Sequence, residues 1–234
     1  MIYITGDCHG DFRRFSNKKF EGKEGDVVIV LGDFGLVWDG SKTDDYWIKW
    51  FSKKPYQILF IDGNHENFDK LKEYPEMYLY GGKVHRITDN VFHLMRGEVY
   101  EIEGEKFFVF GGARSHDVDE EHIVEQEDMK KRKLFRKTHQ FYRVNHVSWW
   151  KEEMPNEQEM EHGLINLREN GYCVDYVLSH ERPDINGDML QYYLSFVQRT
   201  CKNPMWFHGH YHKNKYTDGI SCIYDKVVAL DTKK

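Results

Sequence analysis

Cysteine is scarce in this chain, and no Cys-x-x-Cys pair is formed by its four residues, Cys8, Cys173, Cys201 and Cys222. The spacing excludes a dense disulfide framework, so we expect four reduced thiols in the cytoplasm. Histidine is more frequent, with 13 residues. A metal site would therefore be built from nitrogen and oxygen ligands, which suit Mn, Fe, Zn or Co.

Long apolar runs are also missing. No segment is long enough to span a bilayer, and no secretory signal follows Met1, because the apolar start at residues 2–4 runs at once into Gly6-Asp7. We find no internal repeat, linker or low-complexity segment. The 234 residues therefore predict a single domain, 1–234, without a membrane partner.

An excess of basic residues is absent as well. The net charge of -6 argues against broad electrostatic capture of nucleic acid, although a local basic patch would permit it. Residues 116–170 carry an acidic run followed by a basic one, and we expect a charged, mainly helical insertion at the rim of a cleft. Its charges favour a solvated helical face over nucleic-acid contact. Its pair Trp149-Trp150 favours packing onto the core over stacking on a base.

Short apolar runs do occur, and polar residues follow them. Residues 1–5, 27–31 and 58–61 have the apolar character of buried strands. The intervening helices or loops predict βαβ units and a parallel sheet, in which the carboxyl ends of the strands lie side by side. This arrangement would bring together in one cleft the residues that follow these strands: Asp7, His9, Asp33, Asn64 and His65.

Later segments predict a second sheet. Residues 91–94, 99–102 and 106–110 are typical of a β-meander, and residues 220–224 and 227–231 of a closing hairpin that completes this sheet. Two further strands, 174–178 and 205–207, end near histidines. His210 and His212 are two residues apart, as are Asp7 and His9, so in an extended segment each pair lies on one face. The histidines that follow these two strands are His180, His208, His210 and His212.

Five blocks, each closing a predicted strand, resemble those of the calcineurin-like metallophosphoesterase superfamily and occur in the same order. They are Gly6-Asp7-Cys8-His9-Gly10, Gly32-Asp33, Gly63-Asn64-His65-Glu66, Ser179-His180 and Gly209-His210-Tyr211-His212. The resemblance implies an α/β fold of two packed mixed β-sheets flanked by helices, a four-layer αββα sandwich. It covers the whole chain apart from the insertion.

The resemblance also implies two divalent or trivalent transition-metal ions. Mn is the favoured metal, and Fe, Zn, Ni or Co are the alternatives. One ion would be held by Asp7, His9 and His212, and the other by Asn64, His180 and His210. Asp33 would bridge them, since a carboxylate has two oxygens. A hydroxide between the ions would attack phosphorus, and His65 would act as general acid. The expected substrate is a phosphorylated small molecule or nucleotide, with a phosphodiester favoured over a phosphomonoester.

Residues beside the predicted ligands are assigned supporting roles. Arg114 and Arg182 are predicted to bind substrate, with a surface salt bridge as the alternative for each. Four residues are predicted to bond to ligand side chains from behind and to fix their tautomers: Asp62, Glu66, His208 and Asp231.

One departure from related branches narrows the function. Ser/Thr protein phosphatases of this superfamily carry Arg-Gly shortly after the second Gly-Asp, where this chain has Phe34-Gly35-Leu36-Val37-Trp38. Protein phosphatase activity is therefore disfavoured, and it stays an alternative beside phosphomonoesterase activity. A non-catalytic scaffold would have lost ligands, whereas all seven ligand positions and His65 hold suitable residues.

Overall fold

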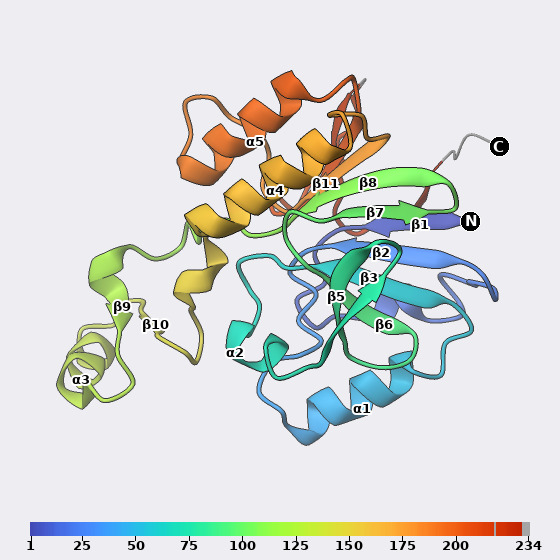
Figure 1. The fold of residues 1–234 in the computed structure, drawn as a ribbon. Coiled ribbons are helices and arrows are strands. Elements are labelled where there is room, and N and C mark those ends of the chain that lie inside the picture. Colours follow the sequence, from blue (N-terminus) through green and yellow to red (C-terminus); the bar gives the residue numbers. More distant parts are fainter. Residues whose placement is uncertain (218, 231–234) are drawn as a thin grey trace.

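The structure is a computed structural model and describes residues 1–217 and 219–230. Most of its strands form two sheets, shown in Figure 1. The first sheet has a parallel centre of β1, β2, β3 and β6, and antiparallel strands at both edges. In pairing order its strands are β14 (Val228–Ala229), β1 (Ile2–Thr5), β2 (Val27–Leu31), β3 (Gln57–Ile61), β6 (Val91–Leu94), β5 (Gly82–Arg86) and β4 (Glu76–Leu79).

The second sheet is also mixed. Its strands pair in parallel except for the edge strand β7, which is antiparallel to β8. In pairing order they are β13 (Ile220–Cys222), β12 (Met205–His208), β11 (Tyr176–Ser179), β8 (Glu105–Phe110) and β7 (Val99–Ile102). A separate two-stranded parallel sheet consists of β9 (Ile123–Val124) and β10 (Arg143–Val144).

The two large sheets pack face to face. In β2, Ile29 and Leu31 point into the apolar layer between the sheets, whereas Val28 and Val30 point to the outer face, because side chains alternate along a strand. The second sheet contributes Leu178 to the same inner layer. Burial on both faces explains why β2 is a continuous apolar run.

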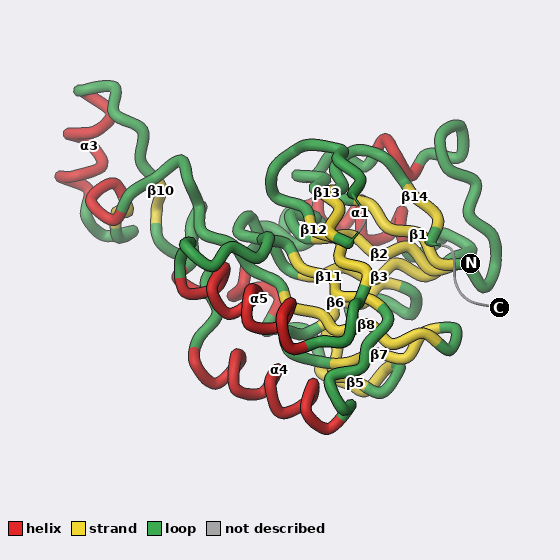
Figure 2. The backbone as a smooth tube through the Cα atoms, turned by 90° about the horizontal axis from the view of Figure 1, so that it is seen from above, coloured by secondary structure: helices red, strands yellow, loops and turns green. Residues whose placement is uncertain are grey.

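Helices cover the two outer faces (Figures 1 and 2). Phe51 of α1 (Lys42–Phe51) packs on the first sheet, and Leu167 of α4 (Glu157–Glu169) and Leu194 of α5 (Met189–Thr200) pack on the second. The remaining short helices of the core are η1 (Arg13–Phe15) and α2 (Phe68–Leu71). The predicted four-layer αββα fold is confirmed. None of the helices among the described residues combines the length and the apolar character needed to cross a membrane.

Local sequence sets the limits of α1. The Ser41 side chain accepts a hydrogen bond from the Thr43 backbone N–H at 3.2 Å and so caps the helix. The helix therefore begins at Lys42. It ends at Phe51, ahead of Pro55.

Three parts of the predicted topology were wrong. β6 belongs to the first sheet, where it pairs in parallel with β3, and not to a meander in the second. The edge strands β4 and β5 were missed, because β4 is largely exposed and lacks the apolar pattern of a buried strand. The closing segments form no hairpin: β13 joins the second sheet and β14 joins the first, so the end of the chain connects both sheets.

The region 116–170 contains η2 (Glu120–His122), β9, α3 (Met129–Lys137), β10, η3 (Lys151–Glu153) and α4. Figures 1 and 2 show α3, β9 and β10 extending away from the two large sheets. Because α4 packs on the second sheet, the part that leaves the core is shorter than predicted. We call residues 116–156 the extension.

A buried histidine pair at the edge of the first sheet should make folding sensitive to acid. His85 and His93 lie directly opposite each other on β5 and β6, with their Nδ1 atoms 2.9 Å apart. Burial, together with the charge of His93, lowers the pKa of His85 to about 4, although the charge of Asp62 opposes the shift.

Because this pKa lies below that of the unfolded chain, the unfolded state binds more protons between pH 6.5 and 4, and stability is lost as pH falls through this window. His85→Gln should reduce this loss by on the order of 1–3 kcal/mol in urea unfolding. His139→Gln, at an exposed histidine, is the control. Equal losses in the two variants would contradict the assignment.

Candidate metal centre

All seven predicted ligands lie where strands of the two large sheets end. The first sheet brings Asp7, His9, Asp33 and Asn64 through β1, β2 and β3, and the second brings His180, His210 and His212 through β11 and β12. The structure thus places residues from opposite ends of the chain at one edge of the sandwich.

Asp7, His9 and His212 form the first group, with potential ligating atoms within 4.8 Å of one another. His212 Nε2 lies 3.1 Å from Asp7 Oδ2. His9 Nε2 lies 3.0 Å from His212 Nε2 and 3.8 Å from Asp7 Oδ2. These three side chains therefore point at a common position.

Asp33, His180 and His210 form a second group on the same criterion of 4.8 Å. His180 Nε2 is 3.4 Å from Asp33 Oδ2 and 3.3 Å from Asn64 Oδ1. The amide of Asn64 therefore belongs to this group.

One oxygen of Asp33 faces both groups. Asp33 Oδ2 is 3.6 Å from His9 Nε2 and 3.4 Å from His180 Nε2. Asp33 Oδ1 instead accepts the backbone N–H of His65 at 2.7 Å. In the same way, Asp7 Oδ1 accepts the backbone N–H of His210 at 3.0 Å. In both carboxylates a backbone amide occupies one oxygen and leaves the other directed into the centre.

The donor set fits metal cations. The carbonyl of Leu31 lies 2.7 Å from His180 Nδ1 and can only accept, so Nδ1 carries a proton. In a neutral ring Nε2 is then a bare acceptor that faces two more acceptors, Asp33 and Asn64. Only a cation or a proton satisfies all three. Among the described residues, the buried atoms Asp7 Oδ2 and His210 Nε2 have no hydrogen-bond partner.

Electrostatics lead to the same conclusion. Burial by itself lowers the pKa of His180, but the negative charges of Asp33 and Asp7 outweigh it and raise this pKa to about 10. For His210 burial dominates, with the charge of His180, and lowers the pKa to about 3. In the absence of a cation His180 thus carries the compensating proton, and a bound ion would replace it.

Glycines beside the ligands leave room for neighbouring ligands. A Cβ atom at Gly63 would lie 2.1 Å from Asp33 Oδ1, and one at Gly32 would lie 2.2 Å from His180 Nδ1. Close packing between strand ends therefore requires glycine directly before Asn64 and directly before Asp33, in addition to any need for a turn.

The backbone at the centre is strained. Four predicted ligands, His9, Asp33, His210 and His212, have positive φ angles of 47°, 49°, 67° and 48°. Such conformations cost free energy for residues other than glycine and persist where the surrounding structure holds them. Their concentration among the predicted ligands marks this edge as a functional site.

The predicted general acid, His65, lies next to the first group. Its ring is 5.3 Å from that of His9, measured between centroids. Burial lowers the pKa of His65, Asp33 opposes the shift and Arg143 adds to it. The ring is therefore mostly neutral at pH 7.

The two predicted substrate-binding arginines are half-exposed and each contacts an acid. Arg114 Nε is 3.5 Å from Asp188 Oδ2, and an Arg182 guanidinium nitrogen is 3.3 Å from Asp184 Oδ2. Arg182 also lies over the ring of Tyr211, at 5.2 Å from its centroid. Both arginines thus make the surface ion pairs that the sequence left as the alternative.

The three described residues among the predicted supporting residues are all buried, but they contact different kinds of groups. Glu66 is buried and accepts the Phe34 backbone N–H at 2.8 Å, beside Asp33. Asp62 binds the buried Arg96 at 2.6 Å and lies near His93. His208 is buried, with Nδ1 3.0 Å from the Gly209 carbonyl oxygen. Asp231 lies outside the described residues.

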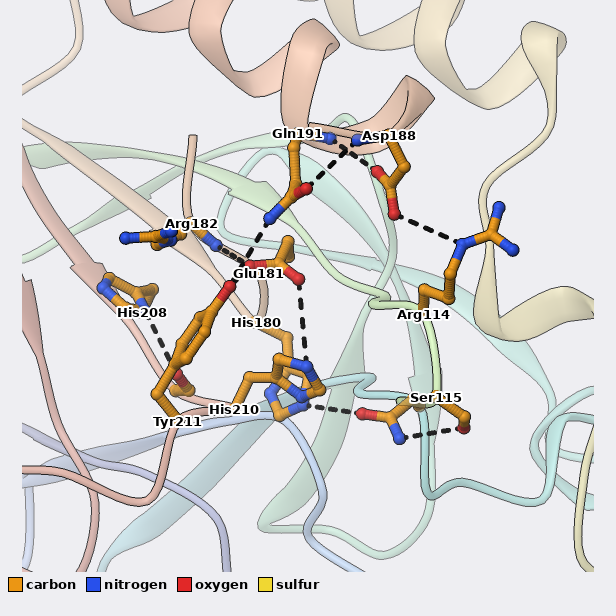
Figure 3. A network of polar contacts seen from close by, with 12 residues as sticks. Arg114, Ser115, His180, Glu181, Arg182, Asp188, Gln191, His208, His210 and Tyr211 are labelled. Carbon is orange, nitrogen blue, oxygen red and sulfur yellow. Dashed lines mark hydrogen bonds and ion pairs between the residues drawn. The ribbon is translucent and has the colours of Figure 1, made fainter. Parts of the chain in front are cut away.

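Glu181 and His116 were missed. Together with His210 they form a further group with potential ligating atoms within 4.8 Å of one another. Figure 3 shows Glu181 pointing to His210, with Glu181 Oε2 3.8 Å from His210 Nε2. Its other oxygen, Oε1, accepts the Tyr211 hydroxyl at 2.5 Å. The only sequence signal for Glu181 was its position directly after His180.

Substitution of Gly63 should disturb the centre without replacing any predicted ligand. In Gly63→Ala the new methyl group must displace the Asp33 carboxylate, so Mn²⁺ binding measured by calorimetry should weaken on the order of 10–100-fold. In the control Gly104→Ala, a Cβ meets no atom within 4 Å but the positive φ of 82° strains alanine, so this variant should lose stability and keep the wild-type Mn²⁺ affinity. Unchanged Mn²⁺ affinity in Gly63→Ala would contradict the role of Asp33.

Comparison with known proteins adds an independent finding. No curated protein matches the chain. Residues 1–214 match the family described as calcineurin-like phosphoesterase, a range that includes all the predicted ligands. Members are metal-dependent phosphoester hydrolases, in agreement with the two groups of potential ligands. The chain therefore belongs to the calcineurin-like phosphoesterase family.

Proposed function

We propose that this phosphoesterase uses two transition-metal ions, Mn first, to hydrolyse a phosphodiester or nucleotide-like substrate. The observation that carries the proposal is the position of Asp33 Oδ2 between His9 and His180, at 3.6 and 3.4 Å. One buried carboxylate oxygen is thereby shared by two groups of ligands, which suits a pair of neighbouring ions.

The ligand assignment follows from the two groups. We assign Asp7, His9 and His212 to one ion, and Asn64, His180 and His210 to the other, with Asp33 between them. Asp7 and Asp33 contribute two negative charges against the four positive charges of two divalent ions. The net positive charge favours binding of an anionic phosphate and stabilises the negative charge that builds up during attack.

The reaction needs an attacking water and a stabilised leaving oxygen. Two such ions, when bound, supply positive charge and lower the pKa of a bound water towards neutrality. The water oxygen forms a bond to phosphorus while the bond from phosphorus to the ester oxygen breaks. We assign to His65 the stabilisation of that leaving oxygen, because its ring lies beside His9. As its pKa is lowered, the ring at pH 7 mainly donates an N–H hydrogen bond, and the protonated general acid is the minor form.

A cavity one hydrogen bond away from the ligand Asn64 could hold part of a substrate larger than phosphate. Its volume is about 1220 Å³, and residues of the core and the extension line it. None of the predicted ligands lines this cavity, and neither does His65. Its link to the centre is Ser115, which bonds Asn64, while Val118, Trp149 and Met154 form an apolar wall. A nucleoside-sized group fits such a mixture of apolar and polar walls.

We also propose that the protein works in the cytoplasm on a small phosphorylated molecule or nucleotide. The free thiols of Cys8, Cys173, Cys201 and Cys222 support a reducing compartment.

Activity on two chromogenic esters should test the reaction class. With Mn²⁺ added, we expect hydrolysis of bis-p-nitrophenyl phosphate to exceed that of p-nitrophenyl phosphate, and EDTA to abolish both. A preference for the monoester would assign a phosphomonoesterase instead, and turnover of phosphopeptides a protein phosphatase. A protein that binds Mn²⁺ without acting on any ester would be a scaffold.

The role of His65 should depend on the leaving group. His65→Ala should lower kcat on the order of 10²–10⁴-fold for a poor alkoxide leaving group, and less for p-nitrophenol, which needs little stabilisation. His65→Asn keeps a hydrogen-bond donor and should recover part of the loss. A general acid would show a different result: His65→Asn as slow as His65→Ala, and a wild-type rate that falls as pH rises through the lowered pKa of His65.

A further inference from the structure

A chain of buried hydrogen bonds leads from Asn64 into the extension. Asn64 Nδ2 donates to Ser115 Oγ at 3.1 Å, and Ser115 Oγ donates to Glu153 Oε2 at 2.6 Å. The backbone N–H of Ser115 donates to the other oxygen, Glu153 Oε1, at 3.0 Å. The three residues are 4%, 5% and 3% exposed, so water does not replace these bonds easily.

The direction of each bond is fixed by chemistry. Burial raises the pKa of Glu153, and the two bonds from Ser115 oppose the shift. The ionised carboxylate only accepts, so the single hydroxyl proton of Ser115 goes to it. Ser115 Oγ can then only accept from Asn64, which must present its NH₂ group. The amide oxygen of Asn64 is thereby turned the other way, to within 3.3 Å of His180 Nε2.

This orientation matters because an amide has two ends of nearly equal size. If the Asn64 side chain rotated by half a turn, its NH₂ group would face the position shared with His180 and Asp33. An N–H group repels a cation, whereas the carbonyl oxygen is a ligand. A bond that selects one orientation therefore acts on cation binding.

Glu153 is itself firmly placed. Its backbone oxygen accepts the Ala113 N–H at 3.1 Å, and a Cβ atom at Gly112 would lie 2.6 Å from that oxygen. Arg96 donates to the Glu152 carbonyl at 2.7 Å while it binds Asp62. The turn η3 at the base of the extension is thus held against the loop that follows β8. This loop carries Ser115, which Figure 3 labels.

We propose that Ser115 and Glu153 are positioning residues that hold the Asn64 oxygen towards the ion assigned to His180 and His210, and so set the affinity of that one ion. The inference rests on the proposed function, which supplies the ligand assignment. Neither residue touches the substrate. The extension therefore contributes to the metal centre through one buried carboxylate.

Calorimetric titration of the metal-free full chain with Mn²⁺ tests the proposal. In Ser115→Ala one of the two ions should bind on the order of 10–100-fold more weakly, and the other should keep its wild-type affinity. Ser195→Ala removes the hydroxyl of a buried serine on α5 and should change neither ion. Ser115→Thr keeps the hydroxyl and should restore much of the lost affinity.

Glu153→Gln provides a second variant in case Ser115→Ala folds poorly. A glutamine amide can donate to Ser115 Oγ, so the hydroxyl proton is no longer forced away from Asn64. We expect a smaller loss at the same ion. Urea unfolding of each metal-free variant separates a loss of affinity from a loss of stability.

Two results would overturn the proposal. One is that Ser115→Ala and Ser195→Ala give the same two affinities. The other is an equal weakening of both ions together with a less stable metal-free protein, which would mean a purely structural role. Wild-type protein that binds no Mn²⁺ would overturn the proposed function itself, and this inference with it.

Discussion

The structure at the sheet edge depends on two buried carboxylates whose negative charges must be compensated by positive charge. Asp7 and Asp33 are each 1% exposed, and each directs Oδ2 towards histidine nitrogens while a backbone amide holds Oδ1. Burial of such charges without compensation is costly. Here the compensation is a proton on His180 or a bound cation. The negative charges of Asp33 and Asp7 raise the pKa of His180 although the ring is fully buried. The strained backbone and the glycines at the strand ends follow from the need to bring these groups so close together.

The second constraint is that neither sheet supplies a complete set of ligands. The first sheet provides His9 and the predicted oxygen ligands Asp7, Asp33 and Asn64, and the second provides three histidines. The relative position of the sheets therefore decides the geometry of the centre. A close-packed apolar layer between them resists small displacements, and the end of the chain reinforces it through β13 in one sheet and β14 in the other. The rigid sandwich thus acts as the support for the strained loops.

Sequence patterns predicted the strand ends well, because a buried parallel strand has a distinctive apolar run and its carboxyl end has a fixed place in the sheet. They failed where pairing partners decide the outcome, as for β6, whose four buried residues fit either sheet. Within the site, the strand-end residues could be predicted, whereas Ser115, Glu153 and Glu181 could not. Ser115 contacts Glu153 and Asn64, which are 38 and 51 residues away in the chain. Glu181 contacts the ring of His210, which follows a different strand.

The position of Asp33 refines the assignment made from the sequence. The sequence argument gave one carboxylate oxygen to each ion, yet Oδ1 is occupied by the His65 amide and Oδ2 alone faces both groups. If two ions bind as proposed, this one atom would serve both, and their affinities would be independent only while Asp33 keeps its position. The His65 amide and Gly63 hold it there. By the reciprocity of linked equilibria, an ion that is stabilised through the oriented Asn64 amide must in turn stabilise the contact between Ser115 and Glu153, and with it the base of the extension.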